Sequence, residues 1–171
     1  MGGHVITQAA ERCADRLASL VYVSAFLPAH GQSLTDLDIS SFDSVVPNYV
    51  APDREHGVVR FDDNGAEEAF YHDCSPEDVA LGRSLLRPEP LEPRTTPVDL
   101  TAKRYGDVPR VYVESTADRA LPIGFQRSMR EAVPCDSAYS LESGHSPFLS
   151  RPDRLTETLL DVAEGDQFRA R

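Results

Sequence analysis

Nearly unbroken apolar runs alternate with helical periodicities at the two ends of this chain. The runs Leu20–Phe26 and Arg110–Glu114 are rich in β-branched and aromatic residues, which is typical of strands buried on both faces of a parallel sheet. Ser137–Leu141 predicts a third, shorter strand. Apolar positions spaced by three and four residues predict helices before the first strand, between the second and third, and after the third. The pattern therefore predicts an α/β fold of about three parallel strands with flanking helices.

The predicted helices have definable buried faces and ends. In the first helix the expected buried stripe is Val5, Ile6, Ala9, Ala10, Cys13 and Leu17. In the second it is Ile123, Phe125, Gln126, Met129, Ala132 and Val133, and Pro134 ends the helix. The last helix is expected to begin at Ser150, with Asp153 completing a capping box, and to bury Leu155, Leu159 and Val162. Gly165–Arg171 is polar and predicts a frayed end.

Residues 29–98 differ from both ends, because they are polar and interrupted by prolines. Short helices are expected over Asp63–Cys74 and over Pro76–Leu86, the latter with Ser75 as N-cap. Arg87–Pro97 has no helical period and predicts an extended return to the core. The chain thus divides into residues 1–28, an inserted middle segment 29–98, and residues 99–171.

Composition excludes several classes of function. A net charge of −11 over 171 residues would repel nucleic acid and anionic membranes. The three cysteines are widely spaced, so neither a disulfide framework nor a zinc knuckle is expected. No apolar run approaches the ~20 residues of a membrane span, and no signal peptide is recognisable, so a cytoplasmic protein is expected. Glu68 and His72 are four positions apart and could lie on one face of a helix. A metal site needs three or four ligands, so we interpret them as residues of a solvent-exposed helix face. No cofactor is expected.

An acid and a base follow two of the predicted strands. Asp118 comes after the second strand and His145 after the third, and the carboxyl ends of parallel strands meet at one edge of the sheet. A carboxylate there can hold an imidazole in the tautomer that accepts a proton from a nucleophile. Each residue also has a structural interpretation: Asp118 as a turn residue, His145 as a loop residue capping the last helix. Ser24 and Ser146 lie outside any Gly-x-Ser-x-Gly motif, so neither is expected to be the nucleophile.

Five local motifs carry a resemblance to a known family. They are Met1-Gly-Gly, Ala9-Ala-Glu11, Val21-Tyr-Val-Ser-Ala-Phe-Leu-Pro28, Ser115-Thr-Ala-Asp-Arg-Ala-Leu-Pro122 and Gly144-His-Ser-Pro-Phe148. In order and spacing they resemble the C-terminal part of an α/β-hydrolase, of the methylesterase and hydroxynitrile-lyase branch and its bacterial relatives. The resemblance implies a Ser-acid-His triad whose last two roles fall on Asp118 and His145. It also implies that the middle segment is a helical cap.

The resemblance also has a gap. The family's nucleophile elbow reads Gly-His-Ser-Met-Gly-Gly or similar, and this chain begins at the Met. We therefore expect an N-terminally truncated hydrolase, with Met1 in the position that offers an oxyanion-hole donor. The full-length form is expected to be a carboxylic-ester hydrolase and this chain to be inactive by itself. The alternative is a non-catalytic binding domain or a degenerate remnant of the same fold.

The remaining expectations concern the substrate and partners. Phe26, Leu27 and Phe148 are candidates to line an apolar pocket for an ester-like small molecule. Ser146 stands where the related plant lyases have a Lys after the catalytic His, which disfavours lyase chemistry. The first strand would expose a backbone edge, through which two copies of the chain could pair as a homodimer.

Overall fold

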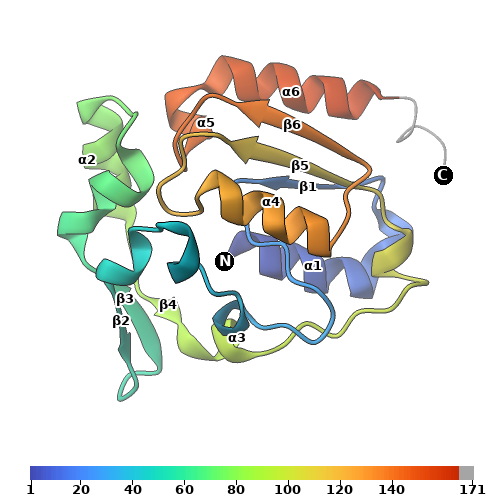
Figure 1. The fold of residues 1–171 in the computed structure, drawn as a ribbon, viewed down its shortest axis with the longest axis horizontal. Helices are drawn as coiled ribbons and strands as arrows, with labels where there is room; N and C mark the ends of the chain where they lie inside the picture. The colour runs from blue at the N-terminus through green and yellow to red at the C-terminus, as the bar shows by residue number, and fades with distance from the viewer. Residues whose placement is uncertain (166–171) are drawn as a thin grey trace.

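The computed structural model describes residues 1–165 and contains a central three-stranded parallel sheet (Figure 1). Its strands are β1 (Leu20–Val23), β5 (Arg110–Ser115) and β6 (Ser137–Leu141), in the order β1-β5-β6. Both pairings are parallel. This confirms the predicted α/β class with three parallel strands and flanking helices.

Helices cover both faces of the central sheet (Figure 1). The helices α1 (Gly2–Cys13) and α4 (Ile123–Ala132) lie on one face, and α6 (Pro152–Glu164) lies on the other. The larger core lies between the sheet and the first two helices and contains Ala10, Tyr22, Tyr112, Phe125 and Met129. The smaller core joins Leu155 of α6 to Val113 and Leu141 of the sheet. Apolar residues on both faces explain the unbroken apolar runs of the strands.

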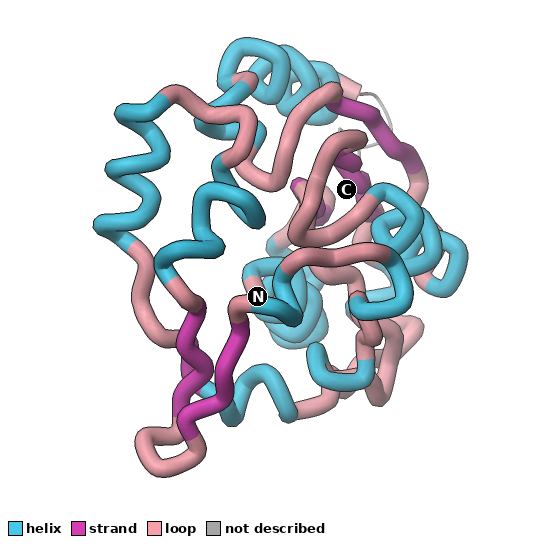
Figure 2. The backbone as a smooth tube through the Cα atoms, turned by 60° about the vertical axis from the view of Figure 1, so that its left-hand side comes forward, coloured by secondary structure: helices cyan, strands magenta, loops and turns pink. Residues whose placement is uncertain are grey.

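The middle segment forms a second, antiparallel sheet beside the first. Its strands are β2 (Val50–Asp53), β3 (Val58–Phe61) and β4 (Glu89–Pro90), and Figure 2 shows the β2–β3 hairpin projecting from the body. Sequence reasoning expected helices alone here and missed the hairpin, whose turn contains Gly57 at a positive φ of 65°. That conformation costs glycine little, and the glycine between two valine-containing runs was the available signal.

The helices of the middle segment match the sequence in part. Helix α2 (Pro76–Leu85) has Ser75 as its N-cap, and the Ser75 hydroxyl accepts a hydrogen bond from the Asp78 amide, so the predicted cap is confirmed. The expectation of an extended Arg87–Pro97 is wrong, because β4 is followed by helix α3 (Leu91–Thr95). Pro93 falls in the first turn of α3, where its missing N–H is not needed. Between Asp63 and Cys74 the chain forms a 3-10 turn (Asp63–Gly65) and a π-helical turn (Glu67–Tyr71).

The buried face of α1 differs from the predicted stripe. Gly3, His4, Thr7 and Ala10 are buried, whereas Val5 is 53% exposed. A Cβ on Gly3 would lie 2.0 Å from the Phe26 carbonyl oxygen, so the helix turns its smallest residue toward the chain after β1. Close backbone approach, rather than side-chain hydrophobicity, decides which face is buried here.

The last helix also differs from its prediction at its start. Ser150 ends the short helix α5 (Pro147–Ser150), and α6 begins at Pro152 without a side-chain cap. Leu155 and Val162 are buried as expected, but Thr158 is buried in place of Leu159, which is 38% exposed. The expected frayed segment after Gly165 lies outside the described residues. Short 3-10 turns complete the chain at Ala14–Arg16, Leu34–Asp36, Ser40–Phe42, Val46–Asn48 and Tyr105–Asp107.

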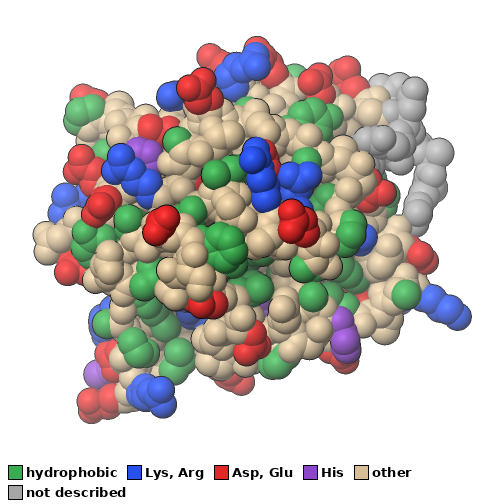
Figure 3. Space-filling model, viewed as in Figure 1, with side chains coloured by type: hydrophobic (Ala, Val, Ile, Leu, Met, Phe, Trp, Pro, Cys, Tyr) green, Lys and Arg blue, Asp and Glu red, His purple; other side chains and the backbone are tan. Residues whose placement is uncertain are grey.

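The surface of the molecule carries charges of both signs, scattered over the face seen in Figure 3. Within residues 1–165, no helix combines the length and the apolar character needed to cross a membrane. Strand β1 pairs with β5 alone in the described part of the chain, so one of its backbone edges is unpaired there.

A buried carboxylate ties α4 to the central sheet. Glu114 of β5 binds Arg127 and Arg130 of α4, each at 2.8 Å, and accepts a hydrogen bond from the Ser140 hydroxyl of β6 at 2.7 Å. Burial alone would raise the pKa of the Glu114 carboxyl, but these hydrogen bonds and the two guanidinium charges bring it below its usual value of 4.5. The ionised form therefore stabilises the fold.

We expect Glu114→Gln to lower the free energy of unfolding at pH 7 by about 1–3 kcal/mol, because it removes the charge that faces two arginines. Since the folded pKa is depressed, this contribution is complete above pH 4.5 and is lost as the pH falls through the folded value. Urea titrations at pH 7 and pH 4 measure both effects. Glu142→Gln, at an exposed position beside the same sheet, is the matched control. An equal loss for the two variants at pH 7 would contradict the assignment.

Candidate active site

An acid and a base meet at the carboxyl end of the central sheet. The Nδ1 atom of His145 lies 2.8 Å from Oδ2 of Asp118. The Asp118 side chain is fully buried, whereas the His145 side chain is 26% exposed. Because a carboxylate only accepts, the imidazole donates its Nδ1–H, which leaves Nε2 as a proton acceptor. In the described residues the ring makes no other hydrogen bond.

Strand pairing explains why these two side chains meet. Register partners on β5 and β6 run from Val111 with Ser137 to Ser115 with Leu141, so the strands end together. The pairing continues into the loops, where Thr116 N donates to Leu141 O at 2.9 Å and Ala117 N donates to Ser143 O at 3.0 Å. The loop that carries Asp118 is thus bonded to the loop that carries His145.

The turn after Asp118 holds the carboxylate in place. Its Oδ1 atom accepts hydrogen bonds from Ala120 N at 2.7 Å and from Leu121 N at 2.8 Å. One carboxylate oxygen therefore serves the turn and the other serves His145. The turn interpretation and the acid interpretation of Asp118 both describe real contacts of the same side chain.

A cavity of about 340 Å³ adjoins His145 and is lined mainly by apolar side chains. Phe26 and the 60% exposed Phe148 line it, as does Met1 at the start of α1. Leu27, expected in the same lining, instead lies in the larger core and is almost completely buried. Further lining comes from the middle segment, through Ile39, Val46, Val50, Val59, Phe61, Phe70 and Leu86.

The middle segment contacts the histidine loop directly. The Phe70 ring packs on the His145 ring with centroids 5.3 Å apart, and Phe61 packs behind Phe70 at 4.6 Å. Oδ2 of Asp73 accepts a hydrogen bond from Gly144 N at 2.7 Å. A Cβ on Gly144 would lie 2.5 Å from the Asp73 carboxylate, so the approach requires glycine. Residues 70–73 therefore hold both His145 and the residue before it.

The sequence analysis did not identify Asp73 as a candidate site residue. Burial alone would raise the pKa of its carboxyl, but the hydrogen bond from Gly144 N contributes to a pKa below its usual value of 3.8. No local motif marks this role, because Asp73 and Gly144 are 71 positions apart. Only the fold brings them together.

Ser24 and Ser146, the two serines considered as nucleophiles, are both buried. In the described residues, neither side chain makes a hydrogen bond to the His145 ring. Ser24 follows β1 with a positive φ of 44°, lines the cavity, and has its hydroxyl 2.6 Å from that of Ser115. The Ser146 carbonyl accepts hydrogen bonds from the amides of Leu149 and Ser150 at the start of α5. The His145 environment thus contains an acid but no serine partner for Nε2 in the described part of the chain.

Charged side chains occur at one side of the cavity. Arg94 donates to Glu89 at 2.6 Å, and both residues line the cavity together with Arg87. Within residues 1–165, no group of three or more His, Cys, Asp and Glu side chains is placed so that it could hold a metal ion. Glu68, weighed as a ligand, accepts a hydrogen bond from the Tyr49 hydroxyl instead.

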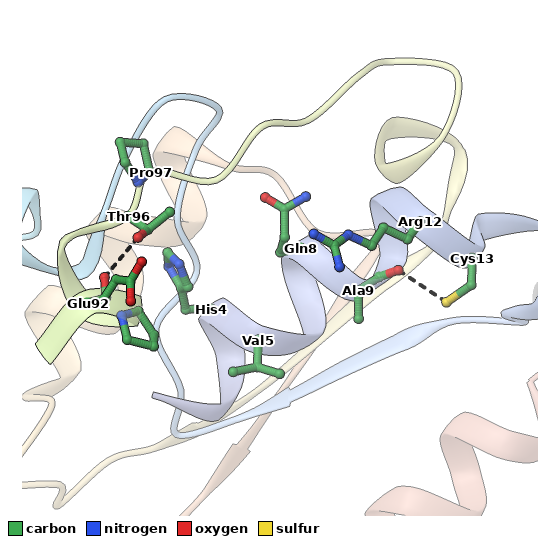
Figure 4. A pocket seen from close by; sticks show the side chains of 10 residues that line it. His4, Val5, Gln8, Ala9, Arg12, Cys13, Glu92, Thr96 and Pro97 are labelled. Carbon is green, nitrogen blue, oxygen red and sulfur yellow. Dashed lines mark hydrogen bonds between the residues drawn. The ribbon is translucent and has the colours of Figure 1, made fainter. Parts of the chain in front are cut away.

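A second, larger cavity of about 620 Å³ lies between α1 and the stretch around α3 (Figure 4). His4 and Gln8 line it from α1, and Glu92 and Pro97 line it from the other side. Burial is the main cause that lowers the pKa of His4. This cavity contains neither Asp118 nor His145, so the acid–base pair belongs to the smaller one.

Comparisons with known proteins agree with this fold. The model of the "Alpha/beta hydrolase family" matches residues 1–158. The chain is 28% identical to "Putative methylesterase 13, chloroplastic" of Arabidopsis thaliana, over 95% of this chain and 39% of that protein. Among solved structures, tomato methylketone synthase I in complex with 2-tridecanone is 28% identical with a TM-score of 0.81. A pyrethroid hydrolase from Sphingobium faniae JZ-2 is 26% identical with a TM-score of 0.85.

These matches cover nearly all of this chain but only part of each similar protein. The two structures are matched over 95% and 96% of this chain but over 67% and 68% of their own chains. The chain spans about two fifths of the length of the methylesterase.

We expect Asp73→Ala to release the histidine loop, because Gly144 N would lose a charged acceptor in a partly buried place. Hydrogen exchange at the Gly144 amide should accelerate by about 10-fold or more, since hydrogen bonds to charged groups contribute about 1.5–3 kcal/mol. Amide exchange followed by NMR measures this. Asp63→Ala, which removes the same charge from an exposed position in the same segment, is the control. Unchanged exchange at Gly144 in Asp73→Ala would show that the contact does not hold the loop.

Proposed function

The chain belongs to the alpha/beta hydrolase family, and we propose that it supplies the acid and the base of a carboxylic-ester hydrolase. The observation that carries the proposal is the His145 imidazole, bonded through Nδ1 to the buried Asp118 and left without a partner at Nε2 in the described residues. This is the arrangement a general base needs, since the acid sets the tautomer and stabilises the imidazolium.

The reaction follows from that geometry. His145 takes the proton of a serine hydroxyl as the hydroxyl attacks the ester carbonyl, and Asp118 stabilises the positive charge that forms on the ring. The same imidazolium then gives its proton to the leaving alcohol. In the second half, His145 activates water against the acyl-enzyme, and serine is released. Met1 is proposed to offer its backbone N–H to the oxyanion, a role supported by its place in the cavity lining.

The nucleophile in this proposal is a serine from outside residues 1–165. The hydrogen bonds of His145 support this, because they include no serine of the described chain. We therefore propose that residues 1–171 alone are inactive as an esterase.

The substrate is proposed to be a small apolar ester, with the middle segment as a cap over it. Support comes from the largely apolar lining of the cavity, to which the middle segment contributes aromatic and aliphatic side chains. The name of one similar protein, a putative methylesterase, points to an ester substrate, and that of another, a pyrethroid hydrolase, points to hydrolysis.

Hydrolysis of p-nitrophenyl acetate tests the proposal. We expect turnover from a form extended at its N-terminus by an in-frame Gly-x-Ser elbow and its preceding strands, and none above background from the 171-residue chain. In the extended form, His145→Ala should lower kcat by about 10³-fold or more, because the general base is lost. Activity of the short chain that depends on His145 would refute the external nucleophile. Inactivity of both forms, with ligand binding retained, would favour a non-catalytic binding domain.

A matched variant separates the base from the rest of the cavity. His4→Ala changes a buried histidine in the second cavity and should leave kcat/KM within about 3-fold of the unmodified extended protein, since it touches no reacting atom. If His4→Ala lowered kcat/KM as much as His145→Ala does, the effect of His145→Ala could be explained by lost side-chain packing and would not show that His145 is the general base.

A further inference from the structure

Three buried serine hydroxyls form a chain across the carboxyl end of the central sheet. The Ser143 hydroxyl, after β6, donates to the Ser115 hydroxyl at 2.9 Å, and Ser115, at the end of β5, lies 2.6 Å from the Ser24 hydroxyl after β1. All three residues are at most 4% exposed. This chain of hydroxyls therefore connects the ends of all three strands. It ends at Ser24, the one of the three serines that lines the cavity with His145.

Burial, together with the number of hydroxyl protons, assigns a direction to these hydrogen bonds. A serine hydroxyl has one proton to donate and two lone pairs to accept with. Ser115 already accepts from Ser143, and Ser24 is the only other partner of its hydroxyl in the described residues. The 2.6 Å distance alone fits either direction, but Ser115 is completely buried, so its proton needs an acceptor inside the protein, and Ser24 is the one available. We therefore assign Ser115 as the donor and Ser24 as the acceptor. The proton of Ser24 then has no acceptor among residues 1–165, although the residue is only 4% exposed.

The backbone holds Ser24 in an unusual conformation at this point. Its φ of 44° lies in the left-handed region, which a serine occupies only when its surroundings impose it. Both sides are held: Ser24 N donates to Val113 O at 3.0 Å, and the next carbonyl, of Ala25, accepts from the Tyr112 hydroxyl at 2.6 Å. Such imposed conformations collect at ligand-binding sites.

We propose that the Ser24 hydroxyl donates a hydrogen bond to a carbonyl-type oxygen of the ligand bound in this cavity. The ester as ligand rests on the proposed function, but the donor itself requires only an oxygen acceptor of that kind. Successive hydroxyls polarise one another, so Ser143 and Ser115 strengthen the final donor. Ser24 is thus a ligand-binding residue. It is not the nucleophile, because its oxygen accepts from Ser115 and makes no hydrogen bond to His145.

The test uses 4-phenyl-2-butanone labelled with ¹³C at the carbonyl, a ketone that offers an ester-like acceptor but has no leaving group. Infrared difference spectra of the ketone bound to the 171-residue chain report the hydrogen bond through the carbonyl stretch. We expect the stretch to lie at lower wavenumber in the unmodified protein than in Ser24→Ala. Affinity for the ketone should fall about 3- to 10-fold, the range of one lost neutral hydrogen bond. Affinity for butylbenzene, which lacks the oxygen, should not change.

Further variants keep the result interpretable. Ser24→Gly also removes the hydroxyl but accepts the positive φ without strain, so it provides the comparison if Ser24→Ala does not fold. Ser143→Ala should shift the stretch part of the way, because it shortens the donor chain. His145→Ala should retain the shift, which separates Ser24 from the imidazole as donor.

Two results would overturn the inference. One is the same carbonyl stretch in the unmodified protein and in Ser24→Gly. The other is the absence of ketone binding to the unmodified protein at millimolar concentration. Neither depends on turnover, so the esterase proposal can fail while the Ser24 hydrogen bond stands, and the reverse also holds.

Discussion

The parallel pairing of β5 with β6 is the constraint on which the site depends. This pairing places the carboxyl ends of the two strands side by side. The loops that follow these ends carry Asp118 and His145, which are 27 positions apart in the sequence. The loops continue the pairing through backbone hydrogen bonds, so Asp118 and His145 meet without any flexible linker between them. A slip of register by one residue would turn the side chains of one strand to the other face of the sheet and separate the acid from the base.

Contacts from the middle segment add a second constraint, this time on the base alone. Phe70 packs on the imidazole and Asp73 holds the amide of Gly144, so the wall of the cavity and the position of His145 are coupled. A movement of the middle segment that opened the cavity would also disturb the histidine loop. Gly144 makes the coupling possible, because any side chain there would collide with Asp73 and His72.

Buried polar groups at the ends of the strands are satisfied in sets rather than in pairs. Gln126 of α4 accepts from Ser115 N and donates to the carbonyls of Ser115 and Leu121, which locks the Asp118 loop to a helix. Glu114 links the same helix to two strands. Such networks are costly when one member is missing, and they hold a unique geometry when complete. The open donor of Ser24 is the exception in the serine chain, and it belongs to a residue that lines the cavity.

Much of this protein was determined locally. The apolar runs predicted the three parallel strands, because period and strand propensity act over short stretches. The positions of Asp118 and His145 just after two of those runs made them candidates for an acid and a base that lie side by side. What only the tertiary structure decided involves distant residues. It turned Gly3 rather than Val5 toward the chain after β1, placed Leu27 in the core and formed the β2–β3 hairpin. It also joined Asp73 to Gly144, and Ser115 to both Ser24 and Ser143. These contacts depend on close backbone approach and on the exact position of single polar atoms, which no periodicity records.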